Sequence, residues 1–191
     1  MSDNPFEHWT VLEEEELLRL GARLMVTRQR IRLPDGREVA DYVRFVSQPA
    51  VCIFALTGEG AVICERQYKH GPGRTVLTLP AGSCEEGEET LDAARRELLE
   101  ETGHTSDHWQ CLGEIVTHAN AGGGHFHIFL ARDCCKVAEP CSGDLEEMRI
   151  ETLELPALLQ AMADGEMPLA SDAAAILRAL QALGWLAPQT P

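Results

Sequence analysis

Acidic side chains gather in the segment Leu79–His104, LPAGSCEEGEETLDAARRELLEETGH, which holds eight acids and two arginines. Glu97, Glu100 and Glu101 are spaced i, i+3 and i+4, so on a helix their carboxylates share one flank. Like charges at this spacing cost roughly 0.2–0.5 kcal/mol per pair in an isolated helix. Three carboxylates, with backbone carbonyls from the glycine-containing loop before them, suit a hard cation such as Mg²⁺. The alternative is an amphipathic helix with a Glu-rich solvated face.

A helix that begins near Thr90 and ends before Gly103 must position these acids. Thr90 is a good N-cap, Asp92 suits the positive end of the helix, and Gly103 suits the position after the last turn. Arg96 lies four residues before Glu100 and can reach back to Glu88, so it can orient carboxylates that would otherwise splay apart. The apolar face of the helix is expected to consist of Leu91, Ala94, Leu98 and Leu99.

The same residues form a spaced pattern across 22 positions. Gly82, five residues, Glu88, seven residues and then the run from Arg96 to Gly103 (RELLEETG) resemble the Nudix box. His104 departs from the family pattern, which has an aliphatic residue there, and this should affect packing more than chemistry. The flanking stretches ERQYKHG, LPAG, HIFLA and the acidic loop before RIETLEL are similar to the branch of ADP-ribose and nucleoside-diphosphate-sugar pyrophosphatases. The likeness covers roughly residues 30–185.

The resemblance implies a metal centre. Mg²⁺, with Mn²⁺ as an alternative, would be held by the backbone carbonyl of Ala81 and by Glu97 and Glu101, with Glu100 as a supplementary ligand. Two or more ions would bridge the diphosphate and polarise a water for attack on phosphorus. The structural residues of the motif would be Gly82, Glu88, Arg96 and Gly103.

The resemblance also implies a general base on a loop after the box and a basic contact to phosphate. The loop SGDLEEMRI offers Glu146 and Glu147, and aligning Ile150 with the start of the next strand favours Glu146; an exposed acidic loop without a role is the alternative. The candidate catalytic residues are Glu146, Glu147 and Glu100. The candidate substrate-binding residues are Lys69 and Arg66, with Arg74 as another option.

Composition limits the other classes of function. Hydrophobic residues make up 45% and charged residues 25% of the 191-residue chain, as in ordinary globular proteins. The net charge of −15 would repel nucleic acid and also a free nucleotide unless cations bridge the two. No apolar run is long enough for a membrane span, and no secretory signal is visible. With seven cysteines in no regular framework, these features predict a cytoplasmic protein with reduced thiols.

The order of predicted elements indicates an α+β fold. Residues 1–20 should form a polar helical or frayed lead-in, with the EEEE run merely solvated. Residues 28–46 and 50–68 each read as two strands around a turn, and strands at 111–118, 126–132 and 149–155 follow the acidic helix. Helices are expected at 155–165 and at 170–184, the latter capped by Ser171. The resemblance to the Nudix family implies a β-element at 1–47 that mediates dimerisation and a Nudix domain at 48–191, an α/β/α sandwich with a mixed sheet.

The function that the resemblance implies is hydrolysis of the diphosphate of an ADP-ribose-like nucleoside diphosphate sugar, giving a nucleoside monophosphate and a sugar phosphate. The three glycines of THANAGGGHFH replace residues that could contact the sugar, which broadens the expectation from ADP-ribose to nucleoside-diphosphate sugars. The alternatives are a GDP-sugar or dinucleoside polyphosphate as substrate, or a nucleotide-binding regulator without turnover. A zinc site of Cys134, Cys135 and Cys141 with nearby histidines lacks suitable spacing, and no dinucleotide-binding fingerprint follows a strand. The expected partners are a small-molecule substrate and a second copy of the chain, with no nucleic acid or membrane.

Overall fold

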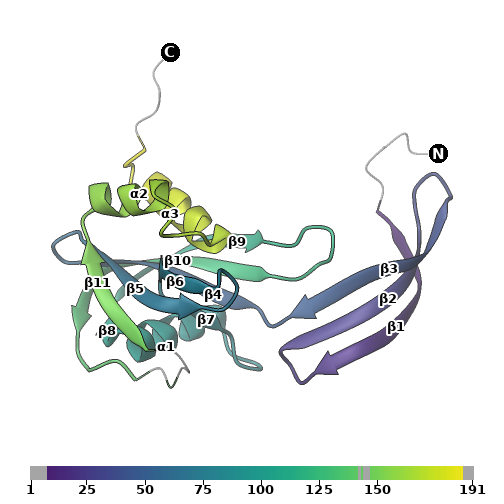
Figure 1. The fold of residues 1–191 in the computed structure, drawn as a ribbon, viewed down its shortest axis with the longest axis horizontal. Coiled ribbons are helices and arrows are strands. Elements are labelled where there is room, and N and C mark those ends of the chain that lie inside the picture. The colour runs from purple at the N-terminus through teal and green to yellow at the C-terminus, as the bar shows by residue number, and fades with distance from the viewer. Residues whose placement is uncertain (1–7, 142, 144–146, 187–191) are drawn as a thin grey trace, which may run out of the picture. The chain divides into compact units, whose positions relative to one another are not determined.

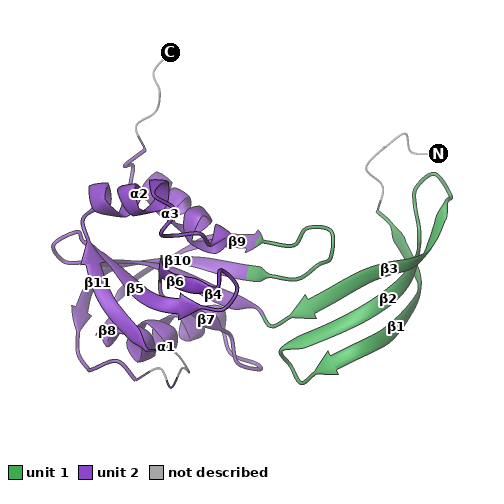
Figure 2. Cartoon of the chain, viewed as in Figure 1, with its two compact units in different colours: residues 1–48, 116–125 green, residues 49–115, 126–191 purple. Residues whose placement is uncertain are grey.

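The structure is a computed structural model that describes residues 8–141, 143 and 147–186. The chain divides into two compact units (Figure 2): residues 1–48 with 116–125, and residues 49–115 with 126–191. The expected general base Glu146 lies outside the described residues. No helix in the described part of the chain is long and apolar enough to cross a membrane.

The first unit is built on a three-stranded antiparallel sheet of β1 (Thr10–Leu20), β2 (Leu24–Arg32) and β3 (Glu38–Ser47). The strands β2 and β3 around a Pro-Asp-Gly turn confirm the prediction for residues 28–46. The prediction of a helical or frayed segment over residues 1–20 is wrong for residues 10–20, which form β1.

Two of the four glutamates in the run of β1 are matched by arginines across the sheet. Glu13 pairs in register with Arg30, and their side chains form an ion pair of 2.6 Å. Glu15 lies opposite Arg28, and these two side chains also form an ion pair. Opposite charges on directly opposed residues stabilise a strand pair, so the run is engaged rather than merely solvated.

The glycines of residues 122–124 also belong to the first unit, where close packing explains them. The backbone N–H of Phe45 donates a hydrogen bond to the carbonyl of Ala121 at 2.9 Å. A Cβ on Gly123 would lie 1.9 Å from the Phe45 ring, and one on Gly124 would lie 1.9 Å from Oγ1 of Thr117. These glycines let the turn approach the sheet closely, which gives them a role independent of any substrate.

The second unit is an α/β/α sandwich around a mixed sheet (Figure 1), as the sequence predicts. Its central order is β11-β5-β4-β10-β8, with β6 on β5, β7 on β4 and β9 on β10. The pair β10–β4 is parallel, whereas β4–β5 and β5–β11 are antiparallel. The elements are β4 (Ala50–Thr57), β5 (Val62–Lys69), β6 (Arg74–Thr78), β7 (Ala81–Ser83), α1 (Thr90–Thr102), β8 (His104–Thr105), β9 (His108–Val116), β10 (His125–Lys136), β11 (Met148–Leu153), α2 (Leu155–Ala163) and α3 (Ala170–Ala182).

Two apolar cores lie on the two faces of this sheet. Alternate residues of β4 point to opposite sides, so Cys52, Phe54 and Leu56 pack with α2 and α3 while Val51, Ile53 and Ala55 pack with α1. Figure 1 shows α1 on one face and α2 with α3 on the other. The acidic helix is therefore held by its apolar side against the central strands, which leaves its other flank for chemistry.

The helix ends differ in detail from the prediction. Gly103 ends α1 in the left-handed conformation (φ 72°) and its N–H donates to Leu99 at 2.8 Å. Thr90 is the first helical residue rather than the cap, and α3 likewise starts one residue before Ser171, after Leu169. Leu99 is 40% exposed and does not belong to the buried face of α1. Neither predicted cap therefore rests on a side-chain hydrogen bond; the packing of the helices against the sheet determines where they begin.

Candidate functional site

The loop before α1 is tied to the helix by the guanidinium of Arg96. Its Nε and Nη2 donate to the two carboxylate oxygens of Glu88, each at 2.9 Å, and Nη2 also donates to the carbonyl of Ser83 at 3.1 Å. Nη1 donates to Glu97 at 2.7 Å and to Glu100 at 3.2 Å. This hydrogen bonding holds the pKa of Glu88 below its usual value. One arginine thus fixes the loop and two acids of the helix together.

The carboxylate of Glu97 lies directly on the backbone of Gly82. A Cβ at position 82 would lie 2.0 Å from Cδ of Glu97 and 2.1 and 2.3 Å from its two oxygens. Only glycine leaves room for this approach. The strand β7 that contains Gly82 is itself fixed to β4, because Val51 pairs with Gly82 and Cys52 with Ala81.

Glu101 is buried beside a second acid that the sequence reasoning missed. It is 3% exposed and accepts a hydrogen bond from the backbone N–H of Ala81 at 2.9 Å. Burial, together with the charges of Glu65 and Glu97, raises the pKa of Glu101 to about 10. Glu65 is fully buried and accepts a hydrogen bond from Nε2 of Gln67 at 3.0 Å. Such a group of buried acids is tolerated in the folded protein only if protons neutralise part of it or a cation binds beside it.

The chemistry of these donors suits a divalent cation. Carboxylates and a backbone carbonyl are the ligands that Mg²⁺ prefers, completed by water and substrate phosphates. Among the described residues, no three His, Cys, Asp or Glu side chains converge closely enough to hold an ion by themselves. In this structure Glu97 and Glu100 are instead turned to Arg96. Water and the oxygens of a substrate would therefore have to complete the coordination of an ion.

A pocket of about 250 Å³ opens beside the same loop. The strands β4 and β5 pair only at Leu56 and Val62, and they diverge toward the end where the pocket lies. Lys69, Ala81 and Gly82 contribute to its wall. The remaining lining residues are Ala50, Gln67, Thr78, Leu79, Ser83, Phe126, Leu169, Ser171 and Asp172. Lys69 therefore lies at the pocket that borders the box loop.

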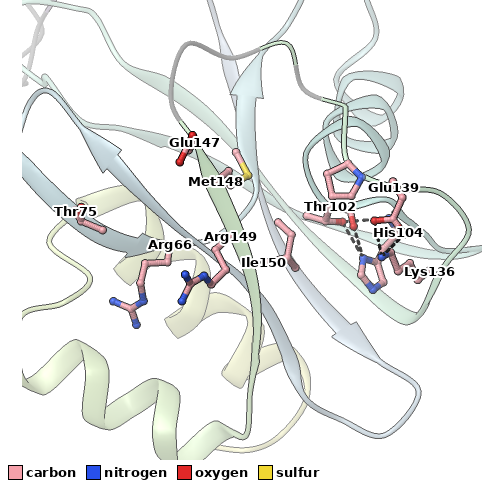
Figure 3. Close-up of a pocket in the computed structure, with 11 residues that line it drawn as sticks. Arg66, Thr75, Thr102, His104, Lys136, Glu139, Glu147, Met148, Arg149 and Ile150 are labelled. Carbon is pink, nitrogen blue, oxygen red and sulfur yellow. Dashed lines mark hydrogen bonds and ion pairs between the residues drawn. The ribbon is translucent and has the colours of Figure 1, made fainter.

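Arg66 lies on a second and larger pocket of about 870 Å³, shown in Figure 3. Its guanidinium forms ion pairs with Glu151 at 2.7 Å and with Glu166 at 2.9 Å, so it is already engaged by carboxylates. Glu147 is exposed and borders the same pocket, near the first residue of β11. The two candidate substrate contacts therefore line different pockets: Lys69 lines the smaller one and Arg66 the larger one. The candidate base Glu147 lines the same pocket as Arg66.

The 870 Å³ pocket also receives His104, the residue that departs from the box pattern. Its Nδ1 lies 2.9 Å from the carbonyl of Thr102, and the ring is half-buried (Figure 3). Arg74, the alternative phosphate contact, donates to the carbonyl of Gly165 at 2.6 Å.

Two further polar residues of the smaller pocket, Gln67 and Asp172, were missed by the sequence reasoning. Asp172 is 1% exposed, in the first turn of α3, and burial raises its pKa to about 7. A signal existed, because Asp172 and Glu65 both interrupt apolar runs, SDAAAIL and VICERQ. Such a pattern can indicate that Glu65 is buried. It cannot indicate that β5 places Glu65 beside Glu101 of α1, because that contact depends on the long-range pairing and packing of the elements.

The comparisons with known proteins agree with this architecture. The family model described as NUDIX domain matches residues 46–172. The chain is 33% identical over 126 residues to an ADP-ribose pyrophosphatase of Bacillus subtilis and 32% identical over 145 residues to one of Mycobacterium tuberculosis. These matches cover 65% and 73% of this chain and 66% of each relative, so the chain spans slightly less than two thirds of their length.

Two other similarities extend further along the chain. A methanol dehydrogenase activator of Bacillus methanolicus is 28% identical over 151 residues, which are 78% of this chain and 79% of that protein. A crystal structure of an ADP compounds hydrolase superposes with a TM-score of 0.78 at 20% identity, covering 95% of this chain and 97% of that one, and so shares the fold. The chain belongs to the Nudix hydrolase family and, within it, resembles the ADP-ribose pyrophosphatases.

Proposed function

We propose that the protein is a pyrophosphohydrolase that cleaves the diphosphate of an ADP-ribose-like nucleoside diphosphate sugar with the help of Mg²⁺. The observation that carries the proposal is the arrangement of Glu97 on Gly82 and of Glu101 on the N–H of Ala81. Two carboxylates meet the backbone of the short strand β7, and a third, Glu65, is buried near Glu101. The similarity to two ADP-ribose pyrophosphatases supports the choice of substrate.

In the proposed reaction, water adds to one phosphorus and the bond from that phosphorus to the bridging oxygen breaks. The products are a nucleoside monophosphate and a sugar phosphate, and the proton of the water passes to a base. Bound Mg²⁺ would neutralise the diphosphate and lower the pKa of the attacking water. Mn²⁺ would serve in the same way.

The residues of the chain have separate tasks in this proposal. Glu97, Glu101 and the carbonyl of Ala81 would hold the ion, with Glu100 as a supplementary ligand once it leaves Arg96. Arg96 and Glu88 would keep the loop in place, Gly82 would let Glu97 approach β7, and Gly103 would end α1. Lys69 would contact phosphate from the smaller pocket.

We propose that the general base lies on the loop that follows the Nudix box. Glu147 borders the larger pocket, while Glu146 is not among the described residues. We keep Glu146 as the first candidate and Glu147 as the second. Separate Gln variants would distinguish them, because loss of the base should lower kcat at neutral pH by about 10²–10⁴-fold.

We also propose that the protein is a cytoplasmic homodimer. The described cysteines, which include all seven, are free, in keeping with a reducing compartment. The first unit exposes Trp9, Val11, Leu17, Leu18, Leu20 and Val43. Leu18, Leu20 and Val43 lie on one face of this sheet by strand register. Exposed apolar side chains gathered on a small sheet are typical of a surface that another chain covers.

An assay of a nucleotide panel with Mg²⁺ tests the proposed activity. ADP-ribose, ADP-glucose, GDP-mannose and a dinucleoside tetraphosphate would be compared, and products identified by mass. We expect the ADP-sugars to have the highest kcat/KM. Cleavage of only the tetraphosphate would refute the substrate class, and binding without any cleavage would make the protein a nucleotide-binding regulator.

A further inference from the structure

Glu65 on β5 is a buried acid that has no task in the reaction proposed above. It is fully buried, and the burial of an acid costs free energy unless the acid is hydrogen-bonded or paired. Ile63, two residues earlier, packs in the core on the α1 side of the sheet. Because side chains two residues apart in a strand share a face, Glu65 faces the helix that carries the proposed metal ligands.

Two neighbouring strands hold Glu65 on one side. Nε2 of Gln67 donates to Oε2 of Glu65 at 3.0 Å and to Oγ1 of Thr78 at 3.1 Å. Thr78 lies directly opposite Glu65 in the pairing of β5 with β6, and its hydroxyl donates to the backbone carbonyl of Glu65 at 3.4 Å. Gln67 and Thr78 are themselves buried. The carboxyl group of Glu65 is thus fixed by protein groups and not by solvent.

On its other side Glu65 meets Glu101 of α1. Burial is the main cause of the raised pKa of Glu101, and a hydrogen bond with the carboxyl group of Glu65 is a further one. Oε2 of Glu101 also accepts a hydrogen bond from the backbone N–H of Ala81 at 2.9 Å. The side chain of Glu101 is therefore held from two directions, by β7 and by β5.

The other two acids of the helix are held differently. Glu97 and Glu100 accept hydrogen bonds from Arg96, and the side chain of Glu100 is 43% exposed. Glu101 is held by a backbone N–H and a carboxyl group, so it can meet an ion without leaving an arginine. Of the three acids, Glu101 is the one whose position before binding depends on a residue outside the box.

The chemistry of the contact determines what the side chain at position 65 must supply. A hydrogen bond between two carboxyl groups needs a hydrogen on one of them. Glu101 must be a carboxylate when it ligates an ion, so the hydrogen then belongs to Glu65. Glu65 accepts from Gln67 with one oxygen and can donate to Glu101 with the other. An amide at this position could do the same, whereas an apolar side chain could not.

We infer that Glu65 is a positioning residue for the metal ligand Glu101, and that the hydrogen-bonded bridge from Gln67 through Glu65 holds the Glu101 carboxylate in place for the ion. The inference deepens the proposed function and rests on it, because it takes Glu101 as a ligand. Loss of a hydrogen bond that orients a ligand typically weakens metal affinity by about 10–100-fold. The size of this effect is large enough to measure on the metal alone.

Titration of the full chain with Mn²⁺, followed by electron paramagnetic resonance without substrate, tests the inference. Glu65→Met keeps the length of the side chain but cannot donate a hydrogen bond, so the Kd for Mn²⁺ should rise by about 10–100-fold. Glu65→Gln keeps the bridge and should bind nearly as tightly as the wild type. Ile63→Met, on the same face of β5, is the matched control for a change in the core and should bind as the wild type.

Steady-state rates on ADP-ribose give a second readout. In Glu65→Met the Mg²⁺ concentration for half-maximal rate should rise by the same factor as the Kd for Mn²⁺. At saturating Mg²⁺ the KM for ADP-ribose should stay at the wild-type value, because Glu65 acts on the ion and not on the substrate. A general disturbance of the fold would change both quantities together.

Two results would overturn the inference. Wild-type affinity for Mn²⁺ in Glu65→Met would leave Glu65 as a buried acid without a role at the site. Equal losses in Glu65→Gln and Glu65→Met would show that the charge of Glu65 matters and its hydrogen bond does not. If Glu65→Met does not fold, Gln67→Met removes the support of Glu65 from the other side and should also raise the Kd; wild-type affinity in that variant overturns the inference.

Failure of the proposed function gives a different pattern. A wild type whose Mn²⁺ affinity depends on Glu65 but which cleaves no diphosphate contradicts the proposed function and supports the inference. A wild type that cleaves ADP-ribose with no dependence of Mn²⁺ affinity on Glu65 contradicts the inference alone. A wild type that binds no Mn²⁺ contradicts both.

Discussion

At the scale of residues, Glu101 combines a proposed role as a metal ligand with the electrostatic cost of a buried carboxyl group. Its carboxyl group is buried near Glu65 and Glu97, and its pKa is raised to about 10. We predict that Glu101→Gln lowers kcat by about 100-fold or more, because an amide cannot replace an anionic ligand. The fold should remain, since the amide has nearly the shape of the carboxyl group and can still accept the hydrogen bond from the backbone N–H of Ala81.

Glu86→Gln provides the matched control for this variant, because Glu86 is exposed in the loop before α1. Steady-state rates and thermal unfolding would be measured on both proteins. Full activity of Glu101→Gln would refute its role as a metal ligand, and loss of folding would show that its main role is structural.

Asp172 gives a second prediction, on stability against pH. Burial raises its pKa in the folded state to about 7 from 3.8, so the folded state holds the proton more tightly than the unfolded state. The stabilisation from this proton is complete below pH 3.8 and is lost as pH rises through 7. Between pH 5 and 8 the wild type should therefore lose at most about 3 kcal/mol relative to Asp172→Asn. Urea unfolding of both proteins in the presence of chelator measures the free energy of unfolding at each pH. If the two proteins show the same dependence on pH, the raised pKa of Asp172 is contradicted.

The residues of the loop and helix that follow one another at fixed spacing could be predicted from the sequence. The residues that reach the site from distant parts of the chain could not. The positions of Glu88, Arg96, Glu97, Glu100 and Glu101 on one loop and helix follow from helical periodicity. Contacts of Glu65 and Asp172 depend on how strands pair and on where α3 packs, which are long-range features. Local sequence carries no direct signal for either.

At the scale of elements, Arg96 joins the loop to α1 and its neighbour Arg95 does not. Arg96 contacts three carboxylates and a carbonyl, with its side chain 24% exposed, whereas Arg95 forms one ion pair with Asp92 and is 53% exposed. We predict that Arg96→Met lowers the free energy of unfolding by about 3 kcal/mol. Arg95→Met should lower it by less than about 1 kcal/mol. Urea unfolding at pH 7 would measure the free energy of unfolding of both variants. Equal losses would show that the contacts of Arg96 with the loop do not stabilise the protein more than an exposed ion pair does.

The contact between β7 and α1 leads to a prediction on Gly82. A Cβ there would collide with the carboxylate of Glu97, which is the mobile end of a flexible side chain. Gly82→Ala should therefore displace Glu97 and lower kcat/KM by about 10–100-fold, with a change in unfolding free energy of less than about 1 kcal/mol. A Cβ on Gly71 would meet no described atom within 4 Å, so Gly71→Ala is the control. Unchanged activity of Gly82→Ala would show that the position of the Glu97 carboxylate does not matter for catalysis, and would contradict its role as a metal ligand.

Elements with strong periodicity were predictable and those decided by partners were not. The helix α1 follows from its apolar spacing and from Gly103. The strand β1 could not be recognised, because a glutamate run has no strand preference and becomes a strand only opposite Arg28 and Arg30. The start of α3 before Ser171 likewise depends on packing against the sheet rather than on a capping side chain.

At the scale of the whole molecule, a net charge of −15 opposes the binding of an anionic substrate. The proposed function resolves this conflict through a cation. We predict that 5 mM Mg²⁺ raises the melting temperature, because an ion that binds only the folded state stabilises it. The increase should be absent in Glu101→Gln and present in Glu86→Gln. An equal increase in all three proteins would indicate general screening by salt.

The product of ADP-ribose hydrolysis tests the central claim most directly. Wild-type protein would be incubated with ADP-ribose, with Mg²⁺ or with chelator, and the products identified by mass spectrometry and ³¹P NMR. The account predicts AMP and ribose 5-phosphate with Mg²⁺, no products with chelator, and about 100-fold less product or lower still with Glu101→Gln in the same time. Release of ADP and free ribose, or cleavage that persists in chelator, would contradict it.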